Sequence, residues 1–288
     1  MNQLQTSRTR QRGFALLLVL WTVALLALLG TQFLRASRIE AVLAHNLGEA
    51  ASLQAATDGA VQIAIFHLLD QSRERWAADG LPRTVKVGTA EVTIRIENEG
   101  GKINPNIAAE SLLTALLLRV GVAPMEARPI AAAILDWRTA TSQAHPRGAK
   151  APEYAAAGLD YGPPGSEFRS IDELGAVLGM RPALLALLRP HLTVFTDADP
   201  DHSTRDPVVL AAVVDTEGPT ALASGRATVL PASAAEGLVV SIVARAQGQN
   251  QASFAERAVV RLNVPAGQEP FEILEVERLN NPKSSAVR

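Results

Sequence analysis

The amino-terminal part of the sequence contains a run of 21 residues, Phe14 to Leu34, without a single charged side chain. An α-helix rises about 1.5 Å per residue, so this run reaches about 30 Å, the thickness of the hydrocarbon core of a bilayer. Residues 14–34 are therefore predicted to form a transmembrane helix. No second apolar run of this length follows, so we expect the chain to cross a membrane once.

The residues ahead of this run predict its orientation. Residues 1–13 include Arg8, Arg10 and Arg12 and no acidic residue. Basic flanks are retained on the cytoplasmic side of a membrane. We therefore expect residues 1–13 in the cytoplasm and everything after Leu34 on the opposite side.

A secretory signal peptide is the ordinary alternative for such an amino terminus. It has an apolar region of about 7 to 15 residues followed by a small-x-small cleavage site. Here the apolar run is longer, and no proline occurs before Pro82. Apolar residues recur at steps of three, four or seven from Ile39 to Leu68, so residues 35–80 are predicted to continue as an amphipathic stalk helix.

Two separate stretches show the period-two alternation of β-strands. Residues 84–100 alternate apolar and polar side chains around Gly88 and predict a hairpin. Residues 236–280 contain three strand-like segments separated by turn residues. We expect these strands to form one antiparallel sheet, followed by a disordered tail at residues 281–288.

Residues 101–215, between the two β-rich stretches, change to a helical period. Asn106 is predicted to cap a helix that is followed by a turn at 121–124 and a second helix ending at Trp137. The fold class predicted is thus α+β, with an α-helical domain inserted into an antiparallel sheet.

A second helical pair follows within the insertion. Ser170 and Glu173 form a capping-box pattern, and residues 179–182 predict a turn before another apolar helix. The segment RDPVVLAAVV predicts one more helix. The extent of the insertion between residues 197 and 237 stays open. The long connection 139–168 is expected to be ordered by aromatic residues, namely Trp137, Tyr154 and Tyr161.

The junction RQRG/FALLLVLW resembles the processing signal of type IV pilins and type II secretion pseudopilins. The resemblance implies a pilin-like fold and cleavage between Gly13 and Phe14 by a prepilin peptidase on the cytoplasmic side, followed by N-methylation of Phe14. Most such proteins carry a glutamate at the fifth mature position. Leu18 occupies that position here, and a buried carboxylate without a partner is costly.

Within these pseudopilins, the missing glutamate is characteristic of the type II secretion system protein K family. The segments GKINPN, LDWR, APEYAAAGLDYGPPGSEFRSIDELGAVLGM and LRPHLTVF resemble that family's helix-hairpin-helix (SAM-like) insertion. The resemblance implies a minor pseudopilin that caps the pseudopilus tip and helps to nucleate its assembly. It also implies a single-pass protein of the inner membrane with a periplasmic carboxyl-terminal domain.

The resemblance further implies several partners. These are the minor pseudopilins of types I, J and H, the prepilin peptidase, and either a secreted substrate or the outer-membrane secretin. No nucleic-acid partner is expected, because the net charge is −2, the turn at 121–124 contains Pro124 and few Lys or Arg surround it.

Three aspartates at alternate positions, Asp197, Asp199 and Asp201, resemble the opening of a calcium loop. An EF-hand is excluded because His202 occupies the sixth position and Val208 the twelfth. A calcium site of another kind and a solvated acidic loop both stay open. Asp136 is a further candidate ligand, but Thr139, Thr141 and Ser142 follow it where acids would be needed.

No catalytic residues are predicted. The sequence has no cysteine, and its five histidines do not fall at metal-ligand spacings. The GxSxG, Walker A and GxGxxG motifs do not occur. The alternative function is a single-pass, membrane-anchored periplasmic enzyme or binding protein, which would require a constellation of catalytic or binding residues that the sequence does not display.

Overall fold

The computed structural model describes residues 8–200, 204–217, 237–248, 252–262 and 269–279. Within the first helix, the side chains of residues 8–13, 15, 29–39 and 41 are outside this description. The leader residues 1–7 and the predicted tail 281–288 lie outside the described residues as well.

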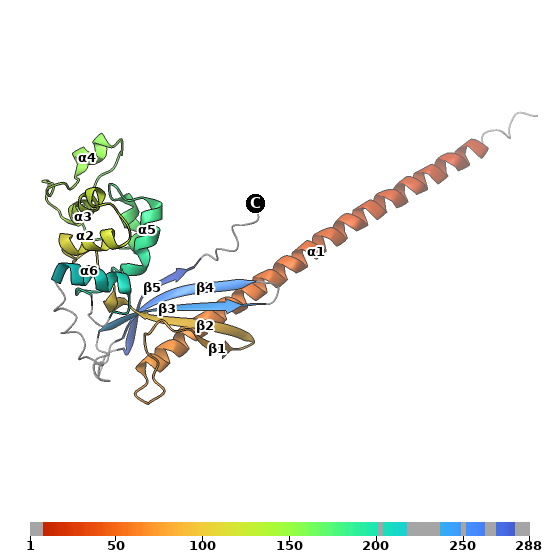
Figure 1. The fold of residues 1–288 in the computed structure, drawn as a ribbon. Coiled ribbons are helices and arrows are strands. Elements are labelled where there is room, and N and C mark those ends of the chain that lie inside the picture. The colour runs from red at the N-terminus through yellow and green to blue at the C-terminus, as the bar shows by residue number, and fades with distance from the viewer. Residues whose placement is uncertain (1–7, 201–203, 218–236, 249–251, 263–268, 280–288) are drawn as a thin grey trace, which may run out of the picture.

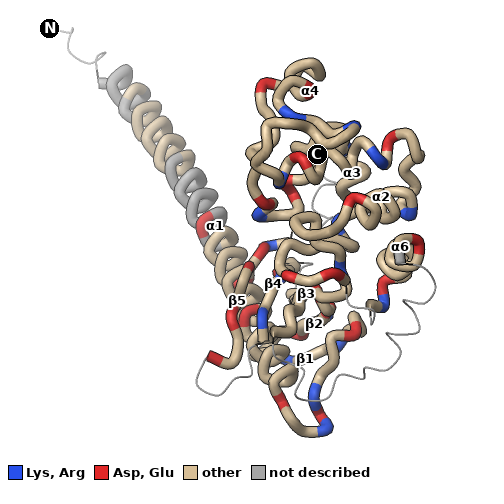
Figure 2. The backbone as a smooth tube through the Cα atoms, turned by 90° about the vertical axis from the view of Figure 1, so that its left-hand side faces the viewer, with Lys and Arg blue, Asp and Glu red and all other residues tan. Residues whose placement is uncertain are grey.

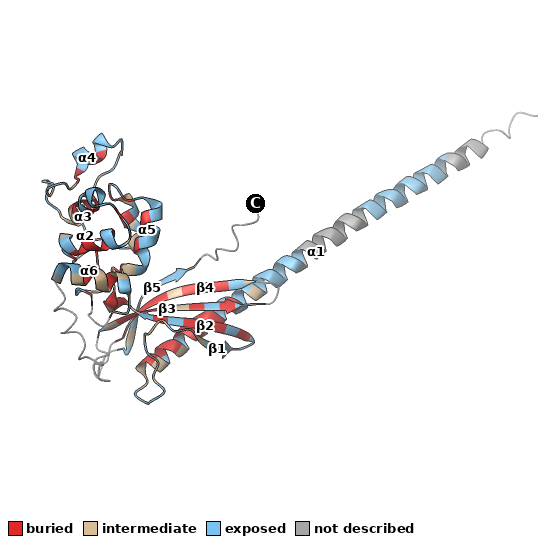
Figure 3. Ribbon diagram, in the orientation of Figure 1, coloured by how far each residue is buried: buried red, intermediate tan, exposed pale blue. Residues whose placement is uncertain are grey.

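A single helix, α1 (Arg8–Leu69), runs for 62 residues from the amino terminus into the body of the protein (Figure 1). Its last third packs on the sheet through Leu53, Ala60, Ala64 and Leu68, which recur at steps of seven, four and four. The described side chains from Phe14 to Gly48 are exposed (Figure 3). The predicted packed face is therefore confirmed from Leu53 to Leu68, but Leu43 and Leu47 are exposed, and the helix ends at Leu69 and not at residue 80.

A search of the described residues finds no helix that is both long and apolar enough to cross a membrane. The predicted transmembrane segment 14–34 lies partly outside those residues, because the side chains of residues 29–34 are among the undescribed ones. The crossing stays a prediction.

Five antiparallel strands form one sheet in the order β1-β2-β3-β4-β5. The strands are β1 (Arg83–Val87), β2 (Ala90–Asn98), β3 (Leu238–Gln247), β4 (Ser253–Leu262) and β5 (Phe271–Arg278). The predicted hairpin is confirmed by the β1–β2 register, in which Val85 lies opposite Val92. In β2, Val92, Ile94 and Ile96 face α1 and are fully buried, as their alternation predicted.

The α-helical head is inserted between two neighbouring strands, since Asn98 at the end of β2 pairs with Val240 in β3. Its elements are η1 (Glu99–Gly101), α2 (Glu110–Arg119), α3 (Pro124–Arg138), α4 (Ala151–Ala156), η2 (Ile171–Ala176), α5 (Pro182–Leu188), η3 (Arg189–His191) and α6 (Pro207–Glu217). The head has a hydrophobic core of its own, separate from the core between α1 and the sheet. The helix predicted from RDPVVLAAVV is present as α6.

Two predicted helix caps are wrong. Ala109, not Asn106, precedes α2, and Asn106 instead bonds to Phe168, donating from Nδ2 to its carbonyl and accepting from its amide. Ser170 precedes a 3₁₀ turn and makes no capping bond with its side chain. Asn and Ser are both residue types that commonly cap helices. The Asn106 side chain, however, makes its hydrogen bonds with the distant Phe168.

Candidate functional site

The head is joined to the sheet through a neck, which we define as residues 99–104 and 191–196. A short parallel β-bridge joins the two segments of the neck. The Ile103 amide donates to His191 O at 2.9 Å, and the Thr193 amide donates to Ile103 O at 3.0 Å. The Asn104 side chain donates to Thr196 O at 2.5 Å. Because Ile103 and Leu192 are also buried, the neck is both packed and hydrogen-bonded, which is expected to make it rigid.

A buried carboxylate, Glu99, lies where the neck leaves β2. Its side chain is 0% exposed, and Oε1 accepts from Lys102 Nζ at 2.7 Å and from Arg257 of β4 at 3.1 Å. Burial by itself raises the pKa of Glu99, but the charges of Lys102 and Arg257 outweigh burial and hold the pKa below its ordinary value. The ionised carboxylate therefore ties the neck to β4.

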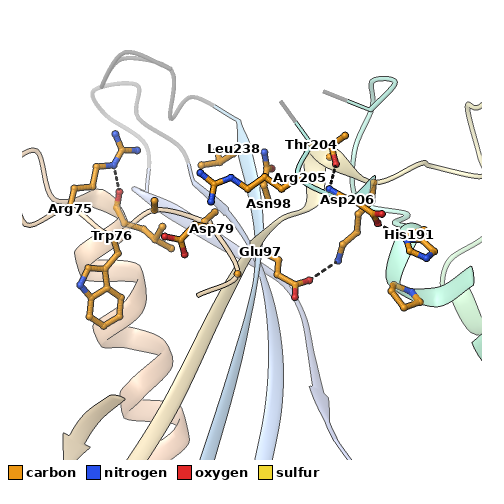
Figure 4. A pocket seen from close by; sticks show the side chains of 17 residues that line it. Arg75, Trp76, Asp79, Glu97, Asn98, His191, Thr204, Arg205, Asp206 and Leu238 are labelled. Carbon is orange, nitrogen blue, oxygen red and sulfur yellow. Dashed lines mark hydrogen bonds and ion pairs between the residues drawn. The ribbon is translucent and has the colours of Figure 1, made fainter. Parts of the chain in front are cut away.

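A pocket of about 700 Å³ opens where the end of α1, the sheet and the neck meet (Figure 4). Trp76 belongs to its wall and is sandwiched: His67 stacks on the ring at 4.3 Å, and the Arg83 guanidinium lies 5.5 Å from its centroid. Arg83 in turn forms a two-pronged ion pair with Asp79. The ring contacts and the ion pair hold the turn after α1 in place, whereas His67 Nδ1 is buried without a hydrogen-bond partner among the described residues.

Glu256 is a second carboxyl group at an interface, between β4 and α1. Its side chain is 5% exposed and faces Thr57 and Asp58 of α1. Burial, followed by the hydrogen bond and negative charge of Asp58, raises the pKa of Glu256 to about 7, although the bond to Thr57 acts in the opposite direction. The charge state of this contact between the stalk and the sheet therefore changes near neutral pH.

Asp136, the weaker of the predicted metal ligands, is fully buried and already engaged. Its carboxylate accepts from the His145 amide at 3.1 Å and contacts His145 Nδ1 at 2.6 Å. Lys150 Nζ donates to the carbonyls of Asp136 and Thr139 at 2.6 Å. Asp136 thus folds the connection after α3 back onto that helix.

The long connection is ordered by aromatic side chains, as predicted. Trp137 stacks on Phe168 at 5.8 Å, and Tyr154 is fully buried with its hydroxyl accepting from the Leu178 amide at 3.0 Å. Tyr161 meets the edge of Tyr154. Burial raises the pKa of Tyr154 to about 12, so this hydroxyl stays protonated at physiological pH.

Of the three aspartates of the predicted calcium loop, the structure describes two. Asp197 and Asp199 are exposed, and Asp201 lies outside the described residues. Within the described ranges, no group of three or more His, Cys, Asp or Glu side chains could hold a metal ion. The calcium site stays a prediction.

The residues of the predicted processing site lie near the amino-terminal end of α1, which extends away from the sheet and the head (Figure 2). Phe14 and Leu18 are both exposed, and Gly13 lies within the helix one residue before Phe14.

Sequence reasoning missed both buried carboxyl groups. For Glu256 a signal was available, because period-two alternation places it on the same face as the buried Phe254 and Ala258. For Glu99 the strand pattern ends one residue earlier, so its burial depends on Arg257 and on the neck, which are distant in sequence.

Comparison with known proteins relates the fold to a family. Residues 93–197 match the family model described as type II secretion system (T2SS), protein K. A chain in the crystal structure of the GspK-GspI-GspJ complex, from the type 2 secretion system of enterotoxigenic Escherichia coli, is similar in fold, with a TM-score of 0.57 at 16% identity. The match covers 85% of this chain and 99% of that chain. Among curated proteins, none matches this chain.

Proposed function

We propose that this chain, whose residues 93–197 match the type II secretion system protein K family, is a minor pseudopilin that caps the tip of the pseudopilus and helps to nucleate its assembly. The observation that carries the proposal is the head. It is an independently packed helical unit inserted at the end of the sheet, on the opposite side from the amino terminus of α1 (Figure 1).

The geometry of the neck supports a capping role. In a filament built by stacking pilin-like subunits along their stalk helices, a bulky unit fixed at the distal end of the body obstructs the addition of a subunit above it. Glu99 and the Ile103–Leu192 bridge hold that unit in one orientation, so the obstruction does not depend on a loose tether. A tip subunit with no neighbour above it also has no use for a glutamate at Leu18, which would need such a neighbour to pair with.

The family places the protein in the cell envelope. We propose that residues 14–34 anchor it in the inner membrane, with residues 1–13 in the cytoplasm and the carboxyl-terminal domain in the periplasm. The apolar length of this segment and the arginines ahead of it support that topology. The proposal includes removal of residues 1–13 by a prepilin peptidase and methylation of Phe14.

The proposed partners are other minor pseudopilins. The similar chain of known structure was crystallised in a GspK-GspI-GspJ complex, and we propose that this chain binds its own type I, J and H counterparts through α1 and the head. The exposed apolar residues Val42, Leu43 and Leu47 of α1 support the first contact. A secreted substrate or the outer-membrane secretin is the partner proposed beyond the tip.

Processing is tested by amino-terminal mass analysis of the protein extracted from membranes. In cells with active prepilin peptidase, we expect the mature chain to begin with methylated Phe14, whereas cells lacking the peptidase should yield the uncut chain. Recovery of an intact Met1 terminus in both strains would contradict the processing proposal.

The tip proposal is tested by Leu18→Glu. Leu18 is the fifth of the 21 apolar residues, and a charge within a membrane helix is costly unless it is paired, so we expect export of a secreted reporter to fall by about threefold or more. Leu18→Gln, which adds similar bulk without charge, is the matched control and should have a smaller effect. Leu18 lies outside the described core, so the unfolding temperature should not change. Undiminished export by Leu18→Glu would remove the argument from the missing glutamate.

A further inference from the structure

A second hollow, of about 480 Å³, lies on the head and is independent of the neck. We call it the head groove. The first half of α3, the connection at residues 147–149 and the turn at 178–181 form its walls. Its apolar lining includes Met125, Ile130, Leu178 and Met180.

The floor of the head groove is kept open by a glycine. Gly179 has a φ of +88°, and a Cβ there would lie 3.0 Å from Ile130 Cγ1, closer than ordinary contact. The two methionines differ in exposure: Met125 is 88% exposed at the rim, whereas Met180 is buried to 9%. Methionine side chains are flexible and polarisable, and they suit surfaces that adapt to a partner.

The rim carries an arginine in an unfavourable backbone conformation. Arg147 has a φ of +67°, the only positive value among the described non-glycine residues. The neighbouring Gly148 explains why the turn is fixed, because a Cβ there would lie 1.9 Å from the buried Asp136 carboxylate. That carboxylate also accepts from the His145 amide, so both sides of Arg147 are anchored.

The guanidinium of Arg147 is exposed, and no acidic residue in the described parts of the chain forms an ion pair with it. Across the groove, Arg181 pairs with Glu126 at 3.1 Å, and both of these side chains are largely exposed. The lining therefore has one more cation than it has anions. A strained residue that is held in place at the mouth of an apolar hollow is typical of a binding site.

We propose that the head groove binds a peptide segment of a partner protein that combines apolar side chains with a nearby carboxylate. The apolar side chains occupy the hollow between Met125 and Met180, and the carboxylate pairs with Arg147. The positive rim favours an acidic segment over a basic one of equal apolarity. This goes beyond the capping role, because it concerns a surface that neither the neck nor α1 contributes to.

The chain contains only three methionines, Met1, Met125 and Met180, so methyl NMR can test the groove in the full-length protein. The protein is labelled with ¹³C-methyl methionine, solubilised in detergent and titrated with a capped peptide carrying two leucines followed by two aspartates. A second peptide has lysines in place of the aspartates. We expect the Met125 and Met180 signals to move with the acidic peptide and to respond at least about tenfold more weakly to the basic one.

Arg147→Gly separates binding from folding. Glycine adopts a positive φ without strain, so this variant should unfold at an equal or higher temperature while binding the acidic peptide at least about tenfold more weakly. The control is Leu187→Gln, at an exposed residue of α5 outside the lining. It should leave the responses of the Met125 and Met180 methyl signals to the acidic peptide unchanged.

Four results would overturn the proposal. One is equal binding of the acidic and basic peptides, and another is undiminished binding by Arg147→Gly. The third is a shift of Met125 and Met180 with protein concentration alone, which would show that a second copy of this chain occupies the groove. Absence of any shift with the acidic peptide would equally contradict it.

Discussion

Glu99→Ala is expected to destabilise the protein by about 3 kcal/mol, because Lys102 and Arg257 would both lose the buried carboxylate with which they form ion pairs. Removing one partner of a buried ion pair costs about 3–5 kcal/mol. The lower end applies here, since Lys102 and Arg257 retain side-chain exposures of 11% and 23%. Thermal unfolding of the full-length protein should show a midpoint roughly 6–12 °C lower.

The matched control is Glu97→Ala. Glu97 also pairs with Lys102, at 3.5 Å, but its side chain is 51% exposed, and exposed pairs contribute about 0–1 kcal/mol. Similar losses of stability in the two variants would contradict the role of burial. A second check is pH: because the pKa of Glu99 is held low, its contribution is present above about pH 4.5 and is lost as pH falls further.

Glu256 is expected to give a pH dependence of the opposite sign. Its pKa in the folded protein is about 7, against 4.5 for an unperturbed glutamate. The folded state therefore binds a proton that the unfolded state has already released between these values. The contribution of Glu256 to stability is fully present below about pH 4.5 and falls by about 3 kcal/mol as pH rises through 7, at about 1.4 kcal/mol per unit of pKa.

The groups that surround Glu256 determine this result. Asp58 and Thr57 face it from α1, Ala244 pairs with it in β3, and Arg278 pairs with it in β5. The Arg278 guanidinium lies over the Phe254 ring at 4.7 Å, and it is not among the groups that shift the pKa of Glu256.

Two variants test the assignment in unfolding experiments between pH 4.5 and 8. Glu256→Gln keeps the shape and cannot ionise, so the fall in stability with pH should disappear. Asp58→Asn removes the neighbouring negative charge and should move the fall to lower pH. If Glu256→Gln keeps the pH dependence of the wild type, another group is responsible.

Patterns that repeat along a single element could be read directly from the sequence. The 3.6-residue period of α1 and the two-residue period of β2 place Leu53, Ala60, Val92 and Ile94 on their buried faces, because each face is determined by backbone geometry alone. The residues of the candidate site were harder to predict from the sequence. Phe14 and Leu18 were identified by resemblance, whereas the neck and the head groove were not identified at all.

The sequence by itself thus determined the elements, their packed faces and the membrane-length apolar segment, since these depend on neighbours within a few residues. Only the tertiary structure decided that Asn98 pairs with Val240 across the whole insertion, that Asn106 bonds to Phe168 and not to its own helix, and that Glu99 meets Arg257. The physical reason is that desolvation and ion pairing depend on which groups meet in space. Packing between segments that are distant in the sequence brings these groups together, and the periodicity of a single helix or strand does not predict such contacts.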